Sequence, residues 1–346
     1  MTPRVLIFAA VILLLAAGCT RPSTTSSLAF ERGVQVLGAG SPRCAIPLFS
    51  QVIGSIPDGP EPHAMLAMAY ALDLQPDPAL RQADVARKKR KPGEDPGWEC
   101  VATGIAALSQ RCPAAAEKSF GQVLAAAPKG SGIRNAAGLW MTLTLLVKGE
   151  SRQAMEFMER ESAPDTPEGR SVTPLLWSVL ICGQQGNTGD AAKSLAALAR
   201  KVTVSRDAEG VQAGDLSACS DQELRERGIV GLRQGRLDQA TEMFAALHER
   251  SPGSGDALIW MALASAAQGN WRQAQDVLRD ACQSGSRPSR SLANHLAGLA
   301  SAFEGNPQEM IGHILTGQRL AFTAPDVMPR PTEAQEEKVW VSDQLN

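Results

Sequence analysis

The sequence predicts an all-α fold made of repeated pairs of antiparallel helices. A sparse pattern occurs three times: a Gly, an Ala twelve residues later, a Phe four residues after that, and a Pro eight residues further on. Each copy closes a unit of about 34 residues, a period typical of stacked helix-turn-helix units. The stretch after the last copy repeats that copy at the same offset. The copies are Gly33, Ala45, Phe49 and Pro57; Gly104, Ala116, Phe120 and Pro128; and Gly228, Ala240, Phe244 and Pro252.

The residue types in this pattern have a mechanical explanation. Gly and Ala fit where two antiparallel helices approach most closely, because neither carries a bulky side chain. The Phe lies one helical turn beyond the Ala on the same face and fills the seam between the helices. The Pro cannot continue the second helix, so it ends the unit.

This pattern resembles the tetratricopeptide repeat, most clearly over Leu224–Pro252, with a turn at Gly235-Arg236-Leu237. The next unit carries matching residues at Leu258, Gly269, Trp271, Ala274 and Leu278. The resemblance implies a tetratricopeptide-type helix-turn-helix solenoid, coiled into a right-handed superhelix of about eight units. It also implies that the first helix of each unit lines the concave face.

The sequence divides into six predicted segments. Between the clear copies lie weaker ones, recognised by small residues and Gly-containing turns. The segments are residues 1–18 (a signal peptide), 19–27 (an acylated tether), 28–205 (units one to five), 206–220 (a loop that breaks the register), 221–324 (units six to eight) and 325–346 (a tail rich in Pro and charge, expected to be disordered).

The amino-terminal segment predicts a lipoprotein. Val5–Ala17 is apolar but shorter than the roughly 20 residues that a spanning helix needs. The end of this segment, Leu15-Ala16-Ala17-Gly18-Cys19, resembles the bacterial lipobox, although Ala16 stands where the family usually has Leu. The resemblance implies cleavage before Cys19 and acylation, of palmitate type, at that residue. The alternative is an ordinary signal peptide with a chance Cys.

The residue after Cys19 bears on localisation. It is Thr20, and the family's inner-membrane retention signal has Asp at this place. In a Gram-negative source the resemblance therefore implies a lipid anchor on the periplasmic face of the outer membrane; in any other source it implies a cell-membrane lipoprotein.

Composition and motifs give little sign of chemistry. The net charge is −2 and aromatic residues make up 4% of the chain, so neither charge nor base-stacking residues favour nucleic acid. The sequence has no phosphate-binding loop and no metal-ligand spacing, so we expect no enzyme activity, no cofactor and no metal. His295 and His313 share the last unit and could face each other, but ordinary packing explains them. The six other Cys are interpreted as small buried residues, with Cys219 and Cys282 as the least implausible disulfide.

One run of basic residues stands out before Pro92. It falls at the end of the second helix of unit two, where cations suit the helix dipole. A solvated helix end is one explanation, and a contact with anionic lipid headgroups or an acidic partner is the other. The run consists of Arg87, Lys88, Lys89, Arg90 and Lys91.

The first helices of the units carry a stripe of apolar residues. The carboxylate-binding clamp of the repeat family is absent from it. If these residues line the concave face, they predict a groove for an apolar helix or strand. The alternative is that the stripe packs between helices. The residues are Val101, Ile105, Leu139, Leu143, Leu146, Leu176, Leu180, Ile259, Leu263, Leu299 and Phe303.

These observations predict a membrane-anchored protein-interaction scaffold. Its resemblance to tetratricopeptide lipoproteins implies an assembly or stabilising factor for a cell-envelope complex of the pilus or secretion type. Its partners would be envelope proteins, and acyl chains on Cys19 would hold it at the membrane. The alternative function is a periplasmic carrier that sequesters an apolar ligand, such as a lipid or an acyl chain.

Overall fold

The computed structural model describes residues 25–91, 93–161, 172–202, 219–253 and 255–321, and these residues form sixteen helices and no strand. The helices form eight antiparallel pairs, one for each predicted unit, so the predicted all-α, tetratricopeptide-type fold is confirmed. The pairs are α2 (Thr25–Gly38) with α3 (Pro42–Ser55), α4 (Pro60–Leu72) with α5 (Pro76–Lys89), α6 (Trp98–Ser109) with α7 (Pro113–Ala126), α8 (Gly132–Val147) with α9 (Ser151–Glu161), α10 (Val172–Gln184) with α11 (Thr188–Arg200), α12 (Asp221–Arg233) with α13 (Leu237–Arg250), α14 (Gly255–Ala267) with α15 (Trp271–Gln283), and α16 (Arg287–Phe303) with α17 (Pro307–Ala321).

The helix boundaries lie close to the predicted segment boundaries. The first helix begins at Thr25, three residues before the predicted start of unit one. The predicted signal peptide, Cys19 and the tail 325–346 lie outside the described residues, as does most of the predicted loop 206–220. At the end of that loop, Ser220 caps α12 in a reciprocal capping box with Glu223.

Within a unit, the small residue and the Phe of the repeat pattern meet as predicted. A Cβ added to Gly33 would lie 2.7 Å from the Phe49 ring, and one added to Gly228 would lie 2.7 Å from the Phe244 ring. Both Phe side chains are fully buried. The Gly is therefore required because the aromatic ring occupies the space that a side chain would need.

The Ala of the pattern supports a stability prediction. Ala240 is fully buried, and a Cβ added to Gly231 of the facing helix would lie 3.2 Å from the Ala240 Cβ. We expect Ala240→Leu to lower the free energy of unfolding by about 1–3 kcal/mol, because three extra heavy atoms overpack this contact. Lys201→Leu is the control, since Lys201 is exposed just after α11. Thermal melts of the two variants test the register, and equal shifts would contradict it.

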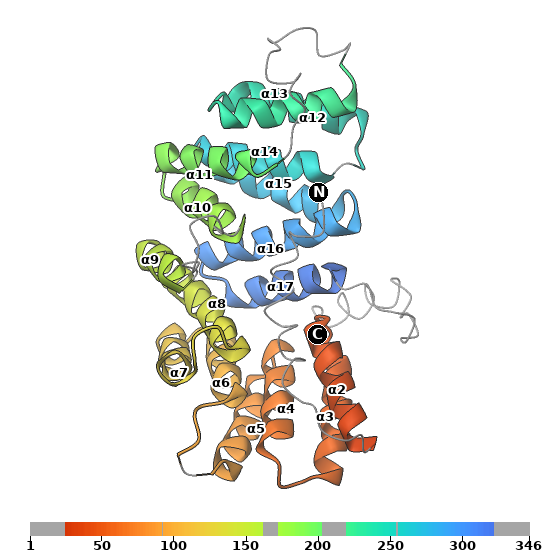
Figure 1. Ribbon diagram of the computed structural model, residues 1–346, viewed down its shortest axis with the longest axis vertical. Helices are drawn as coiled ribbons and strands as arrows, with labels where there is room; N and C mark the ends of the chain where they lie inside the picture. Colours follow the sequence, from red (N-terminus) through yellow and green to blue (C-terminus); the bar gives the residue numbers. More distant parts are fainter. Residues whose placement is uncertain (1–24, 92, 162–171, 203–218, 254, 322–346) are drawn as a thin grey trace.

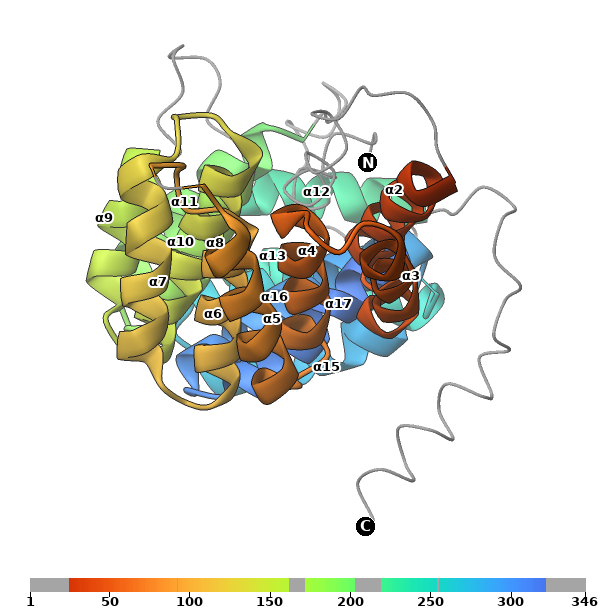
Figure 2. The same cartoon turned by 90° about the horizontal axis from the view of Figure 1, so that it is seen from below.

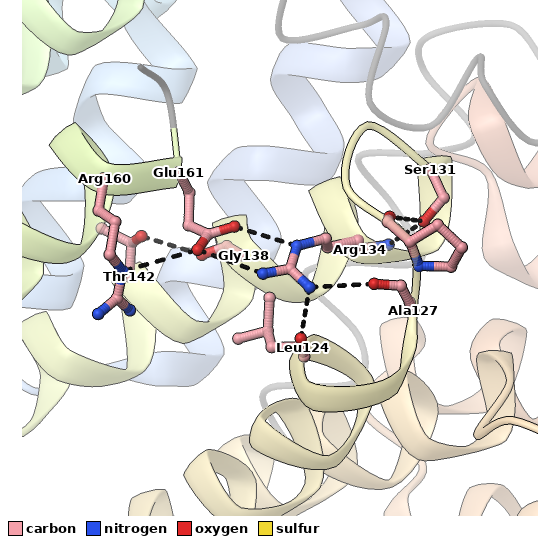
Figure 3. A network of polar contacts seen from close by, with 9 residues as sticks. Leu124, Ala127, Ser131, Arg134, Gly138, Thr142, Arg160 and Glu161 are labelled. Carbon is pink, nitrogen blue, oxygen red and sulfur yellow. Dashed lines mark hydrogen bonds and ion pairs between the residues drawn. The ribbon is translucent and has the colours of Figure 1, made fainter.

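Arginine side chains link the ends of neighbouring helices through hydrogen bonds. Figure 3 shows Arg134 of α8, whose Nη1 donates to the carbonyl oxygens of Leu124 and Ala127 at the end of α7. The Nε of Arg134 donates to Glu161 at the end of α9, at 3.2 Å. Arg287 of α16 similarly donates to the last carbonyls of α17, both at 2.9 Å. These guanidinium groups satisfy carbonyls that a helix end leaves without an intrahelical partner.

The last two units fold back onto the earlier ones. Helix α14 packs against α10 and α11, α16 packs against α8, and α17 packs against α6. In Figure 1, α16 and α17 lie between α10 and the amino-terminal units, and Figure 2 shows them from below, behind α6. Small residues permit the approach: a Cβ on Gly183 of α10 would collide with the backbone of Ala266 in α14. First helices of units four and five thus face first helices of units seven and eight.

The two helices of a unit differ sharply in burial as a result. Eleven of the thirteen residues of α14 are buried, whereas only Ala274, Leu278 and Ala281 are buried in α15. A helix that is apolar on all sides must be covered on all sides. For α14, the second helix α15 covers one side, and α10 and α11 of unit five cover another.

Candidate interaction surfaces

The apolar stripe predicted to line a groove lies in the core. Nine of its eleven residues are buried, with at most 5% of their surface exposed, and the other two, Leu139 and Phe303, are half-buried. The Phe303 ring packs edge-on against Trp271, with the ring centroids 5.4 Å apart. The alternative interpretation, packing between helices, is therefore the correct one. The buried nine are Val101, Ile105, Leu143, Leu146, Leu176, Leu180, Ile259, Leu263 and Leu299.

The physical reason for this correction is the fold-back of units seven and eight. An open solenoid would leave the concave faces of α8 and α10 to a partner, but here α16 and α14 occupy them. A sequence signal for this was present in the near-continuous apolar composition of the first helices. An open groove requires a polar or solvated side on each such helix, and α14 has none.

Three of the five cations of the basic run form ion pairs with carboxylates of the same chain. Arg87 pairs with Asp84 at 2.6 Å, and Lys89 pairs with Asp58 at 3.3 Å. Arg90 forms an ion pair with Glu99. Lys88 and Lys91 are exposed. Of the five residues predicted to contact an anion, Lys88 and Lys91 are therefore the most accessible, and Arg87 is half-exposed.

The Arg90–Glu99 pair is a buried structural contact. Only 14% of the Arg90 side chain and 2% of the Glu99 side chain are exposed. The carboxylate also accepts a hydrogen bond from the backbone N–H of Gly97, at 3.0 Å, just before α6 begins. A Cβ on Gly97 would lie 2.8 Å from Nη2 of Arg90, so the Gly leaves room for the guanidinium. The pair joins the end of α5 to the start of α6.

The turns inside the units show two exceptions to a common rule. In six units the turn between the helices has a Gly with positive φ, as at Gly235, which has a φ of 73°. In units two and three the same place is held by Leu74, with a φ of 57°, and Arg111, with a φ of 59°. Both side chains are exposed. Left-handed backbone costs a non-Gly residue about 1–2 kcal/mol, so this turn edge, defined by Leu74 and Arg111, retains a local strain.

This strain gives a paired prediction at one position of the repeat. Arg111→Gly should raise the free energy of unfolding by up to about 1 kcal/mol, because Gly adopts positive φ freely. Gly235→Ala should lower it by about 1 kcal/mol, since nothing lies within 4 Å of the added Cβ and only the backbone cost remains. Urea unfolding of both variants checks the signs. Shifts of the same sign would show that the turn geometry does not control them.

The cysteines of the described residues form no disulfide with one another. Cys44 and Cys112 are exposed, and Cys100, Cys182 and Cys219 are buried. The structure forms no disulfide between Cys219 and Cys282. Burial raises the pKa of the Cys282 thiol to about 12. A thiol of such high pKa is a poor nucleophile, which agrees with its interpretation as a small packed residue.

The two histidines of the last unit have separate surroundings. His313 lies 3.2 Å from Oδ1 of Asn294, whereas the His295 ring packs against Gly317 of α17. Burial lowers the pKa of His295 to about 4 and also lowers the pKa of His313. In the part of the chain that the structure describes, no three His, Cys, Asp or Glu residues are grouped as metal ligands would be. Over the same residues, no helix is both long and apolar enough to span a membrane.

Comparison with known proteins supports the repeat type. The family model for the tetratricopeptide repeat matches residues 232–281, which include α13, α14 and most of α15. This is the region in which the sequence pattern is clearest. A search of curated proteins finds no match.

Solved structures are similar to this chain only at low sequence identity. A tetratricopeptide repeat protein from Parabacteroides merdae is 12% identical, with a TM-score of 0.41, over 80% of this chain and 99% of that one. Human IFIT1, solved as a dimer with m7Gppp-AAAA, is 15% identical, with a TM-score of 0.39, over 92% and 77%. The TPR domain of P58(IPK) is 15% identical, with a TM-score of 0.27, over 93% and 99%. These TM-scores are low, so the family match is the stronger finding.

Proposed function

Because the chain contains tetratricopeptide repeats, we propose that it is a protein-binding scaffold held at a membrane by acyl chains on Cys19. Repeats of this type form extended surfaces whose neighbouring units present side chains in register. The partner would be an envelope protein, and the role would be to assemble or stabilise an envelope complex of the pilus or secretion type. The location would be the periplasmic face of the outer membrane in a Gram-negative source.

The observation that carries the proposal is the strained turn edge. Stacked helix pairs need a residue with positive φ at this turn, and Gly meets that need in six units. Leu74 and Arg111 meet it in adjacent units at a cost in stability, and both point side chains into solvent. Left-handed backbone at non-Gly residues is concentrated at functional sites, so these two exposed residues are candidates for a contact surface. An exposed Leu and an exposed Arg at equivalent turns of adjacent units would suit a partner that offers both an apolar side chain and a carboxylate.

The experiment compares partner capture with stability in the same variants. The lipidated protein carrying Leu74→Gly and Arg111→Gly should unfold at a higher urea concentration yet lose the envelope protein that the wild type retains on cross-linking. Gly235→Ala is the control: it alters the same turn in unit six, lowers stability and should keep the partner. Undiminished capture by the double variant would show that the partner binds elsewhere.

The anchor has its own prediction. We expect Cys19→Ala to abolish incorporation of a labelled fatty acid and to leave the signal peptide attached, because the acylated thiol is also the point of processing. Metabolic labelling followed by gel mobility measures both effects. Cys44→Ala is the matched control, since Cys44 is an exposed free thiol that should be labelled by neither process. Full labelling of the Cys19 variant would rule out this anchor.

The alternative function, a carrier for an apolar ligand, requires an exposed apolar groove. The residues of the predicted groove are buried between helices. Lipid extraction of the purified protein distinguishes the two functions. Recovery of a stoichiometric lipid beyond the anchor, without a protein partner, would favour the carrier.

A further inference from the structure

One edge of the amino-terminal units exposes aliphatic side chains. Among the described residues, only three large hydrophobic side chains are exposed: Leu28 at 59%, Ile56 at 46% and Leu74 at 39%. Leu28 lies in the first turn of α2, and Ile56 directly follows α3. Because α2 and α3 are antiparallel and joined at residues 39–41, the start of one and the end of the other lie at the same edge. Isolated exposed Leu is ordinary, but two aliphatics at one edge form a patch.

The same edge carries lysines and a tryptophan. The ion pair between Lys89 and Asp58 places the end of α5 beside the α3–α4 connection. Lys88 and Lys91 are exposed there, and half-buried Trp98 begins α6. Lysine and tryptophan are the residues that accompany aliphatics at the boundary between water and lipid.

The charge of this edge is nearly balanced. Its carboxylates are Asp58, Glu61, Asp84, Glu94 and Asp95, in addition to buried Glu99. A balanced edge is not drawn strongly to anionic headgroups. Apolar insertion, with the lysine ammonium groups at headgroup level, is the mode of contact that fits these residues.

The proposed lipid anchor makes the bilayer the expected partner of this edge. Cys19 precedes Thr25, the first residue of α2, by six positions (25 − 19). At about 3.5 Å per residue, an extended tether would reach roughly 20 Å, so an acylated Cys19 holds the start of α2 near the membrane. In Figure 1 the α3–α4 and α5–α6 connections lie at the lower end of the molecule, and α12 and α13 lie at the upper end. The edge nearest the anchor is therefore also an end of the long axis.

From this juxtaposition we propose that the edge formed by Leu28, Ile56, Lys88, Lys91 and Trp98 docks on the lipid bilayer. The proposal rests on the lipid anchor proposed above. Leu28 and Ile56 enter the interface, Trp98 lies at its depth, and the molecule stands with unit six farthest from the membrane. The turns that hold Leu74 and Arg111 lie at the opposite ends of the helices of units two and three, away from the lipid, and both side chains are exposed there.

The test uses the full lipidated protein in vesicles of phosphatidylethanolamine and phosphatidylglycerol with brominated acyl chains. Ile56→Trp places a fluorophore at the docked edge, and Gln234→Trp, at the exposed turn of unit six, is the matched control. We expect brominated lipid to quench at least about half of the emission added by Ile56→Trp and almost none of that added by Gln234→Trp. Equal quenching of the two, or no quenching of either, overturns the docked orientation.

A second measurement uses the tryptophan that the edge already contains. In the wild type, Trp98 should account for most of the lipid-quenched emission, so Trp98→Phe should remove it; quenching that persists contradicts the orientation. Fatty-acid labelling of the same samples separates the two proposals. A labelled protein with an unquenched Ile56→Trp rejects the docked edge alone. An unlabelled Cys19 rejects the anchor, and an Ile56→Trp that is still quenched would then support docking without it.

Discussion

Replacing Leu143 by Asp is expected to lower the free energy of unfolding by more than about 4 kcal/mol. Leu143 is 1% exposed in α8, a helix that packs against α7, α9 and α16. The change removes a packed side chain and leaves a cavity. It also buries a carboxylate among apolar side chains. Each of these effects destabilises the same site, and together they place the change in the range that few single substitutions reach.

Two control variants make the comparison specific. Leu143→Met keeps the volume and should cost less than about 1.5 kcal/mol. Leu28→Asp makes the same chemical change at an exposed position and should change the free energy by no more than about 0.5 kcal/mol in solution. Thermal and urea unfolding measure all three variants. A Leu143→Asp protein that melts like Leu28→Asp would restore the open groove and refute the fold-back of units seven and eight.

Removing the guanidinium of Arg90 is expected to cost about 3–5 kcal/mol, because Arg90→Ala leaves the buried Glu99 carboxylate without its cation. The Gly97 N–H and the Cys100 thiol still donate to that carboxylate, but two neutral hydrogen bonds do not offset the lost ion pair. Lys88→Ala, two residues earlier in the same basic run, should be close to neutral, since Lys88 is exposed.

A double variant tests the assignment to this pair. Arg90→Met combined with Glu99→Gln removes both charges and retains similar volumes, so it should recover most of the stability that Arg90→Ala loses. Urea unfolding of the single and double variants gives the coupling energy between the two residues. Additive losses would mean that the two side chains act independently.

Local spacing explains which parts of the fold were predictable. The contact of Gly33 with Phe49, and of Gly228 with Phe244, follows from helical geometry within about 20 residues of chain. The eight helix pairs were predicted for the same reason, since each unit repeats one supersecondary motif. The start of α2 at Thr25 differs by a few residues, as helix boundaries commonly do.

Distant contacts explain what the sequence did not reveal. The stripe that includes Leu143 and Leu180 was predicted to face a groove because a single unit cannot show what lies across the superhelix. That depends on the small rotation between successive units, summed over several of them. The partner of Arg90 within the basic run was hidden for a more local reason. Glu99 lies nine residues after Arg90, on the far side of a loop, and only the path of that loop brings the two together.

The return of the last units onto the first also sets an order of folding. In an open solenoid each unit contacts only its neighbours, so folding can spread from any unit. Here Gln308 donates to the carbonyl oxygen of Ser109 across 199 residues of sequence, at 2.6 Å. Contacts of such long range form late and slow folding, because a large loop must close before they contribute. During synthesis the sides of α6 and α8 that these contacts cover therefore stay uncovered until α16 and α17 have been made, and uncovered apolar surface of this kind is prone to aggregation.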